Sequence, residues 1–175
     1  MLSTTQAIVL SGVALATLLI VHEFGHYAVA ALAGVPPSDR RIVWFAIPPH
    51  VALADGREWV SPFQNDRFSS AYGRYDPERR YGRLFTAGGL LSQTGWVVLA
   101  AGALGATGLA PAVARAVAAT SLGFVGCYLA WDLLATARRG RPFGDNTHLW
   151  RLSPAYAVGT LSLVVGCHLV VLWWL

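Results

Sequence analysis

Four long runs of apolar residues, separated by polar segments, dominate the chain. They cover residues 7–32, 84–104, 112–137 and 155–175. Each run has about 20 residues or more, which is the length that an α-helix needs to cross the hydrocarbon core of a membrane. The pattern therefore predicts an all-α polytopic membrane protein with about four transmembrane helices, organised as a single domain over residues 1–175.

Residues 34–80, between the first two runs, have a mixed character. Residues 42–47 form an apolar, β-prone run, and residues 51–60 are centred on an Asp55-Gly56 pair that is typical of a hairpin turn. These pieces are too short and too apolar for a soluble domain, so we expect a short membrane-associated β-hairpin region. Residues 61–81 are polar and arginine-rich, and we expect them to run over the surface.

The first apolar run has a competing interpretation as a secretory signal. Residues 28–33 are small and apolar, as a cleavage site requires. However, no basic residue precedes the run, and His22 and Glu23 interrupt it. A transmembrane helix therefore fits this run better than a signal peptide does.

Composition and charge support a membrane protein. Of the 175 residues, 55% are hydrophobic and only 13% are charged, which is too apolar for an ordinary soluble domain. The net charge of +4 could indicate nucleic acid as a partner. Because the arginines flank the apolar runs, we instead expect the lipid bilayer as a partner and no nucleic acid.

The arginines also predict an orientation in the membrane. Four crossings place the connections 34–80 and 138–154 on one side, and the other side has only Arg115. The two connections hold eleven arginines: Arg40, Arg41, Arg57, Arg67, Arg74, Arg79, Arg80, Arg138, Arg139, Arg141 and Arg151. By the positive-inside rule, both connections are cytoplasmic and both termini lie outside, in a plasma (inner) membrane.

One polar motif, His22-Glu23-Phe24-Gly25-His26, lies inside the first run. Residues four apart share a helix face, so His22 and His26 can point ring nitrogens at one metal ion. Glu23 lies beside that metal, where it can take a proton from a metal-bound water. An ionisable side chain at mid-helix costs about 3 kcal/mol or more in a membrane, which favours a functional role. The alternative is a polar cluster that packs helices together.

A catalytic zinc usually has three protein ligands, so a third ligand is needed. Asp145 enters from the same side of the membrane, but an Asp before a helix is also a good N-cap. Asp132 lies on that side too and could instead pair with an arginine, and His148 lies one turn beyond Asp145. We expect His168 to be a packed, hydrogen-bonded histidine, and His50 to be solvated.

Three stretches of the chain together resemble a known family. They are the motif at residues 22–26, then Asp76-Pro77-Glu78-Arg79-Arg80 leading into Ala87-Gly88-Gly89-Leu90, and finally Gly144-Asp145. In this order they resemble the site-2 protease family of intramembrane zinc metalloproteases, and the resemblance covers most of the chain. We expect a compact form of this family, since these 175 residues leave no room for a PDZ-like or nucleotide-binding (CBS) regulatory domain.

The resemblance implies a site and an activity. It implies one Zn²⁺ held by His22, His26 and Asp145, with Glu23 as the catalytic base. The implied reaction is hydrolysis of peptide bonds in or near the transmembrane segments of membrane-protein substrates. Two departures concern the oxyanion stabiliser and the third ligand: Asn146 replaces a small residue, and the Asn-Pro that often precedes the late Asp is missing. The oxyanion stabiliser therefore stays unidentified.

Substrate contacts are expected near the β-prone segment. A helical substrate must unwind before its carbonyls can react, and an edge strand from residues 42–60 could hold it extended. We expect Val43, Trp44 and Phe45 to bind substrate, together with Gly25. Because glycine has no side chain, a substrate can approach the helix backbone closely there. The alternative role for Gly25 is helix packing.

Two other functions compete with a protease. A non-catalytic membrane scaffold of the same fold would give Glu23 no role. A haem-binding membrane protein could use histidines from two helices, such as His22 and His168. It would leave both Glu23 and Asp145 without a role. The substrate's identity and the oligomeric state stay open.

Overall fold

The computed structural model describes residues 4–106 and 111–174. Within these residues the chain is mostly helical, and four helices are long and apolar enough to span a membrane, which indicates a membrane protein. They are α1 (Thr4–Leu32), α3 (Gly82–Ala106), α4 (Pro111–Arg139) and α6 (Pro154–Trp174). The four predicted helices are confirmed as helices. Leu175, the predicted end of the fourth, lies outside the described residues.

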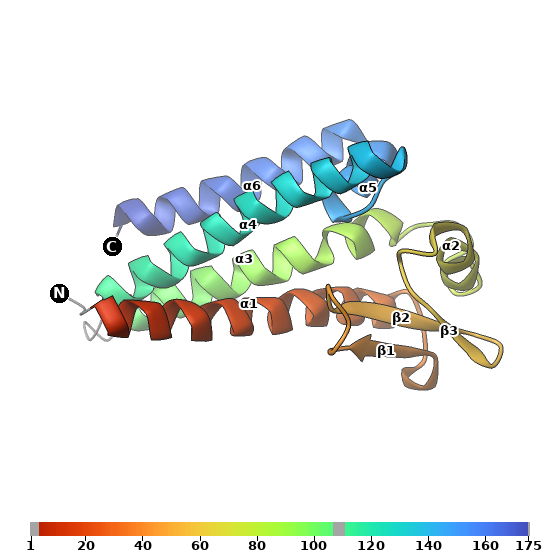
Figure 1. Ribbon diagram of the computed structural model, residues 1–175, viewed down its shortest axis with the longest axis horizontal. Coiled ribbons are helices and arrows are strands. Elements are labelled where there is room, and N and C mark those ends of the chain that lie inside the picture. Colours follow the sequence, from red (N-terminus) through yellow and green to blue (C-terminus); the bar gives the residue numbers. More distant parts are fainter. Residues whose placement is uncertain (1–3, 107–110, 175) are drawn as a thin grey trace.

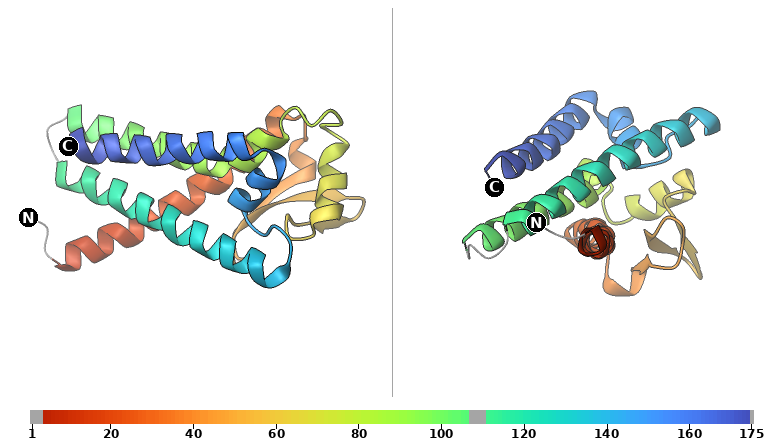
Figure 2. Two further views of the ribbon diagram at one scale, coloured as in Figure 1. Left: turned by 90° about the horizontal axis from the view of Figure 1, so that it is seen from above. Right: turned by 60° about the vertical axis from the view of Figure 1, so that its left-hand side comes forward.

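Helix α3 is the centre of the bundle. It contacts α1, α4 and α6, and it also contacts the short helix α5 (Asp145–Leu152). The start of α1 and the end of α6 lie at one end of the bundle, whereas α5, the sheet and the short helix α2 (Asn65–Gly73) lie at the other (Figures 1 and 2). The two long connections therefore share one end, as four crossings require.

The end of α1 sets the path of the following strands. Gly34 has a positive φ of 87°, a conformation that glycine adopts without strain. The Val35 N–H donates to the Ala30 carbonyl at 3.0 Å, and the Gly34 N–H donates to the Ala31 carbonyl at 3.0 Å. This Schellman pattern ends the helix and turns the chain back toward it. A short 3₁₀ helix, η1 (Pro37–Asp39), then leads into the sheet.

The sheet has three antiparallel strands in the order β1 (Arg40–Val43), β2 (His50–Asp55) and β3 (Glu58–Val60). Asp55 pairs with Glu58 across the turn, where Gly56 has a φ of 66°. The predicted hairpin at Asp55-Gly56 is confirmed. The β-prone run is only partly a strand, because β1 begins at Arg40 and residues 44–47 form a turn.

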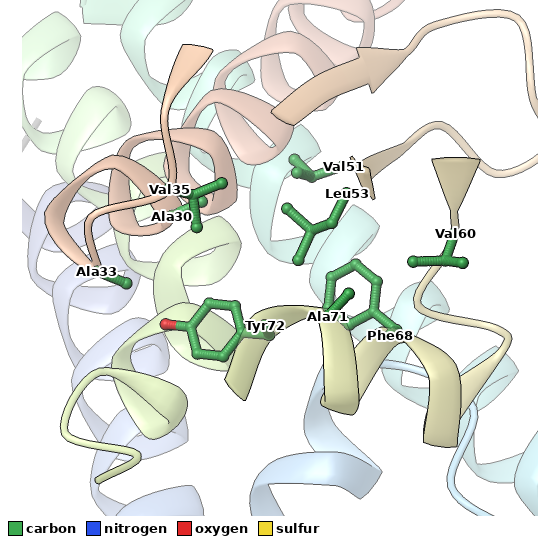
Figure 3. Close-up of a cluster of buried hydrophobic side chains, with 9 residues drawn as sticks. All are labelled: Ala30, Ala33, Val35, Val51, Leu53, Val60, Phe68, Ala71 and Tyr72. Atoms are coloured by element: carbon green, nitrogen blue, oxygen red, sulfur yellow. The ribbon is translucent and has the colours of Figure 1, made fainter. Parts of the chain in front are cut away.

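Helix α2 (Asn65–Gly73) lies in the segment that was expected to run over the surface. Its Phe68, Ala71 and Tyr72 have the i, i+3, i+4 spacing of one helix face and are buried. Figure 3 shows this face directed at side chains of β2, β3 and the end of α1. The spacing is a helix signal, and the many polar residues around it obscured it in the sequence.

Candidate metal centre

Two histidines of α1 form one side of the centre. His22 and His26 are four residues apart on the helix, so their rings lie on the same face. Both side chains are buried, and their Nε2 atoms are 3.2 Å apart. The face that carries them packs against α3, which lies closest to α1.

Asp145, the first residue of α5, brings a carboxylate to the same point. Its Oδ2 lies 3.1 Å from His22 Nε2 and 3.2 Å from His26 Nε2. Two nitrogens and one oxygen thus form a nearly equilateral triangle. Tetrahedral ligands at about 2.1 Å from a zinc ion are about 3.4 Å apart, so the three atoms fit one face of a zinc site. Within the described residues, these three side chains form the group that could hold a metal ion.

Gly89 of α3 makes space for this triangle. A Cβ at Gly89 would overlap the His22 ring and would lie 2.5 Å from His26 Nε2. Any side chain at this position would therefore occupy the space where the ligand atoms converge. The close approach explains a glycine here, in the Gly88-Gly89 pair of the small-residue motif.

A backbone carbonyl orients one of the histidines. His26 Nδ1 lies 2.7 Å from the carbonyl oxygen of Phe85. Because a carbonyl can only accept, Nδ1 carries a proton, which leaves Nε2 as the ring nitrogen that can bind a metal. Metal-binding histidines commonly have such a partner on the other ring nitrogen. His22 Nδ1 is buried and has no hydrogen-bond partner.

Glu23 lies next to the centre without joining the triangle. Its side chain is buried, and Oε2 has no hydrogen-bond partner. The backbone amide of Val51, in the central strand β2, faces the same carboxylate. Glu23 therefore has one oxygen free to accept a proton beside the three ligand atoms.

The charge of Asp145 suits a metal ligand. Burial favours the neutral acid, but the neighbouring His26 and His22 outweigh this effect and hold the pKa of Asp145 well below its ordinary value. The carboxylate is therefore ionised at neutral pH. Although an Asp beginning a helix could act as an N-cap, the N-cap of α5 is Gly144, and the Asp145 side chain points to the histidines.

The other candidates for the third ligand lie elsewhere. Both carboxylate oxygens of Asp132 accept hydrogen bonds, from Gly144 and Thr147, and none of the ion pairs of the described residues includes Asp132. The suggested pairing of Asp132 with an arginine is therefore wrong. His148 Nδ1 lies 2.9 Å from the Gly144 carbonyl, one turn back in its own helix.

The remaining histidines are also accounted for. His168 is completely buried, with Nδ1 2.7 Å from the Val164 carbonyl and Nε2 2.8 Å from Ser121 Oγ, which confirms the packed, hydrogen-bonded histidine. Both of its ring nitrogens are engaged, which disfavours a haem ligand. His50 is half-buried in β2, and its ring packs edge-on against Phe63 with 5.2 Å between the ring centroids. It is therefore not the solvated residue that was expected.

The expected substrate-binding residues separate into two groups. Gly25 faces α3, where a Cβ would overlap Ser92 Oγ and the Gly88 carbonyl. This close approach supports the helix-packing alternative for Gly25, and its contact with substrate stays a prediction. Val43 ends the edge strand β1, and the side chains of Trp44 and Phe45 beyond it are exposed. Trp44 lies 5.9 Å from Phe24 of the α1 motif, measured between ring centroids.

Three residues near the centre were not predicted from the sequence: Phe85, Gly89 and Tyr128. The Tyr128 ring packs edge-on against His22 with 5.7 Å between centroids, and its hydroxyl accepts from the Asp145 N–H at 3.0 Å. Tyr128, Asp132 and Thr136 recur every four residues in an apolar helix. That polar stripe is a signal that could have pointed to Tyr128, whereas Phe85 and Gly89 lie in α3 and had no such signal.

The comparisons with known proteins give no match. No family model, no curated protein and no solved structure matches the chain.

Proposed function

We propose that the protein is an intramembrane zinc metalloprotease, a zinc-dependent endopeptidase similar to the site-2 protease family. The observation that carries the proposal is the triangle of His22, His26 and Asp145, with the free carboxylate of Glu23 beside it. A scaffold or haem protein gives no reason for a carboxylate that is close to the triangle but outside it.

The bundle supports a site inside the membrane. Helix α1 carries the two histidines and is apolar over most of its length, with exposed apolar side chains such as Ile8, Val9 and Ile20. His26 lies eight residues before Gly34, which is about 12 Å along a helix. With both long connections in the cytoplasm, the centre lies below the membrane surface on the cytoplasmic side.

The residues of the chain have distinct roles in this proposal. His22, His26 and Asp145 hold one Zn²⁺, which when bound lowers the pKa of water and polarises a carbonyl group. Glu23 accepts a proton from the attacking water through its free oxygen and delivers it to the leaving amine. The Phe85 carbonyl keeps His26 oriented, and Gly89 keeps the space between the ligand atoms open.

Strand β1 gives a place for an extended substrate. It is an edge strand, so one side of its backbone has no partner strand within the described residues. A locally unwound segment of a membrane protein can pair with such an edge by backbone hydrogen bonds. Val43, Trp44 and Phe45 then lie along the substrate, and Phe24 connects them to the catalytic motif.

Glu23→Gln tests this function. Glutamine has nearly the same shape, but it does not accept a proton at neutral pH. We expect unchanged zinc content and a loss of proteolysis on the order of 10² to 10⁴-fold, as is typical when a general base is removed. A co-expressed panel of single-span membrane proteins serves as substrate, and Glu58→Gln, at an exposed glutamate of β3, is the matched control.

Two results would count against the proposal. Equal products at equal rates from wild type and Glu23→Gln would show that Glu23 is not the base. Purified wild-type protein that takes up no zinc would remove the metal centre itself. A haem absorption band in the purified protein would favour the haem alternative instead.

A further inference from the structure

The turn before α5 is held by one face of α4. Tyr128, Asp132 and Thr136 follow one another at intervals of four residues, so they form a stripe along that helix. Backbone N–H groups of two residues in the turn and of two residues in the first turn of α5 donate to this stripe. Phe143 donates to Thr136 Oγ1 at 3.1 Å, Gly144 to Asp132 Oδ1 at 2.7 Å, Asp145 to Tyr128 Oη at 3.0 Å, and Thr147 to Asp132 Oδ2 at 2.8 Å.

Asp132 is the centre of this arrangement. Its side chain is completely buried, and the Thr147 hydroxyl also donates to it, at 2.6 Å. Its two oxygens thus bind residues on both sides of Asp145. A buried carboxylate is costly unless several donors satisfy it, and here the donors come from the turn that carries the third ligand.

The start of α5 needs such a partner. The first N–H groups of a helix have no carbonyl within the helix, and a glycine at the N-cap has no side chain to satisfy them. Gly144 is that N-cap, and no side chain of the turn caps the helix. A Cβ at Gly144 would lie 2.8 Å from Asp132 Cγ and 3.0 Å from Tyr128 Oη, so a side chain here would push the stripe away.

We propose that Asp132 is a positioning residue that sets the third metal ligand. By fixing the N–H groups of Gly144 and Thr147, it holds the Asp145 carboxylate against His22 and His26. Tyr128 assists from the same stripe, because it contacts the Asp145 backbone and the His22 ring together. The inference rests on the proposed zinc site, and it assigns Asp132 a role through Asp145 rather than at the metal.

A double-mutant cycle on zinc affinity tests this role. Asp132→Asn keeps the size of the side chain but puts an amide where both oxygens accept N–H groups. Competition with a chromophoric chelator in detergent measures the zinc affinity of wild type, Asp132→Asn, Asp145→Ala and the double variant. We expect Asp132→Asn to weaken zinc binding about 10- to 100-fold, as is usual for residues that orient a ligand. In the Asp145→Ala background, the same change should alter affinity by no more than about twofold.

Ser121→Ala is the matched control. Ser121 is a completely buried residue of the same helix. It is hydrogen-bonded to Gln93 and His168 and not to the turn before α5. We expect it to lower thermal stability and leave the zinc affinity unchanged. If Asp132→Asn fails to fold, Thr147→Val leaves Asp132 in place and removes the hydroxyl that donates to it and accepts from the Phe143 N–H. This change should weaken zinc binding less, in the same direction.

The outcomes separate this inference from the proposed function. Wild type that binds no zinc overturns both. Normal binding by wild type and by a folded Asp132→Asn overturns the inference alone, as does an equal loss of affinity with and without Asp145. If Ser121→Ala loses as much zinc affinity as Asp132→Asn, the loss comes from general destabilisation. That result would also overturn the inference about Asp132.

Discussion

Gly89→Ala tests the proposed metal centre from the opposite helix, without replacing any of the three proposed ligand residues. The added Cβ would lie 2.4 Å from His22 Nε2 and 2.5 Å from His26 Nε2, whereas ordinary contact begins at 3.4 Å. Either α3 or the two rings must therefore move by about 1 Å, the difference between the shortest of these distances and ordinary contact. Metal sites tolerate deviations of only about 0.2 Å in ligand distance, so the change is several times too large.

We expect Gly89→Ala to weaken zinc binding by at least about 100-fold, the upper range for changes that only orient a ligand. Metal analysis of protein purified in detergent, followed by chelator competition, measures the loss. Circular dichroism checks that the helices remain. The matched control is Gly95→Ala in the same helix, where a Cβ has no neighbour within 4 Å and zinc binding should be unchanged.

A folded Gly89→Ala protein that holds one zinc with wild-type affinity would refute the geometry of the centre. It would mean that the ligand atoms do not converge against α3. Equal losses in Gly89→Ala and Gly95→Ala would instead attribute the effect to the glycines' role in the bundle. Both variants add a single Cβ atom to α3, so the difference in their zinc affinities reports on the position of that atom alone.

Two further predictions concern packing and orientation. Gly25→Ala should lower the free energy of unfolding by about 1–3 kcal/mol in detergent, because its Cβ meets the α3 backbone, whereas Gly12→Ala, with no neighbour within 4 Å, should not. Equal free energies of unfolding for the two variants would contradict the close contact of α1 with α3 at Gly25. Reporter fusions after Tyr75 and at the C terminus should place the first in the cytoplasm and the second outside. A cytoplasmic C terminus would contradict both the orientation and the number of crossings.

The sequence predicted the long helices well because their signal is local. A predominantly apolar run of this length is stable in a membrane as an α-helix, because the helix satisfies its own backbone hydrogen bonds. Pro111 and Pro154 begin two of the helices, at a position where proline is tolerated. Helix α2 was missed because its three apolar residues lie among polar ones, and burial against the sheet decides its structure. Tertiary contact, rather than composition, makes that segment a helix.

The centre was predictable in part for the same reason. His22 and His26 share a helix face by spacing alone, so the pair follows from the sequence. Asp145 lies far from them along the chain, and its position before a helical segment fits an N-cap equally well. The polar stripe marks one face of α4, but no local pattern shows that this face meets the start of α5 or that Gly89 faces the two histidines.

The separation of the ligands along the chain has a consequence for biosynthesis. His22 and Asp145 are 123 residues apart. At about 5–20 residues per second, a ribosome adds that length in about 6 to 25 s. During this interval the growing polypeptide carries two histidines and Glu23 but no carboxylate to complete the triangle. A chain released early contains His22 and His26 without Asp145, so under the proposed function it could not hydrolyse a peptide bond until α5 has been made and has docked on α4.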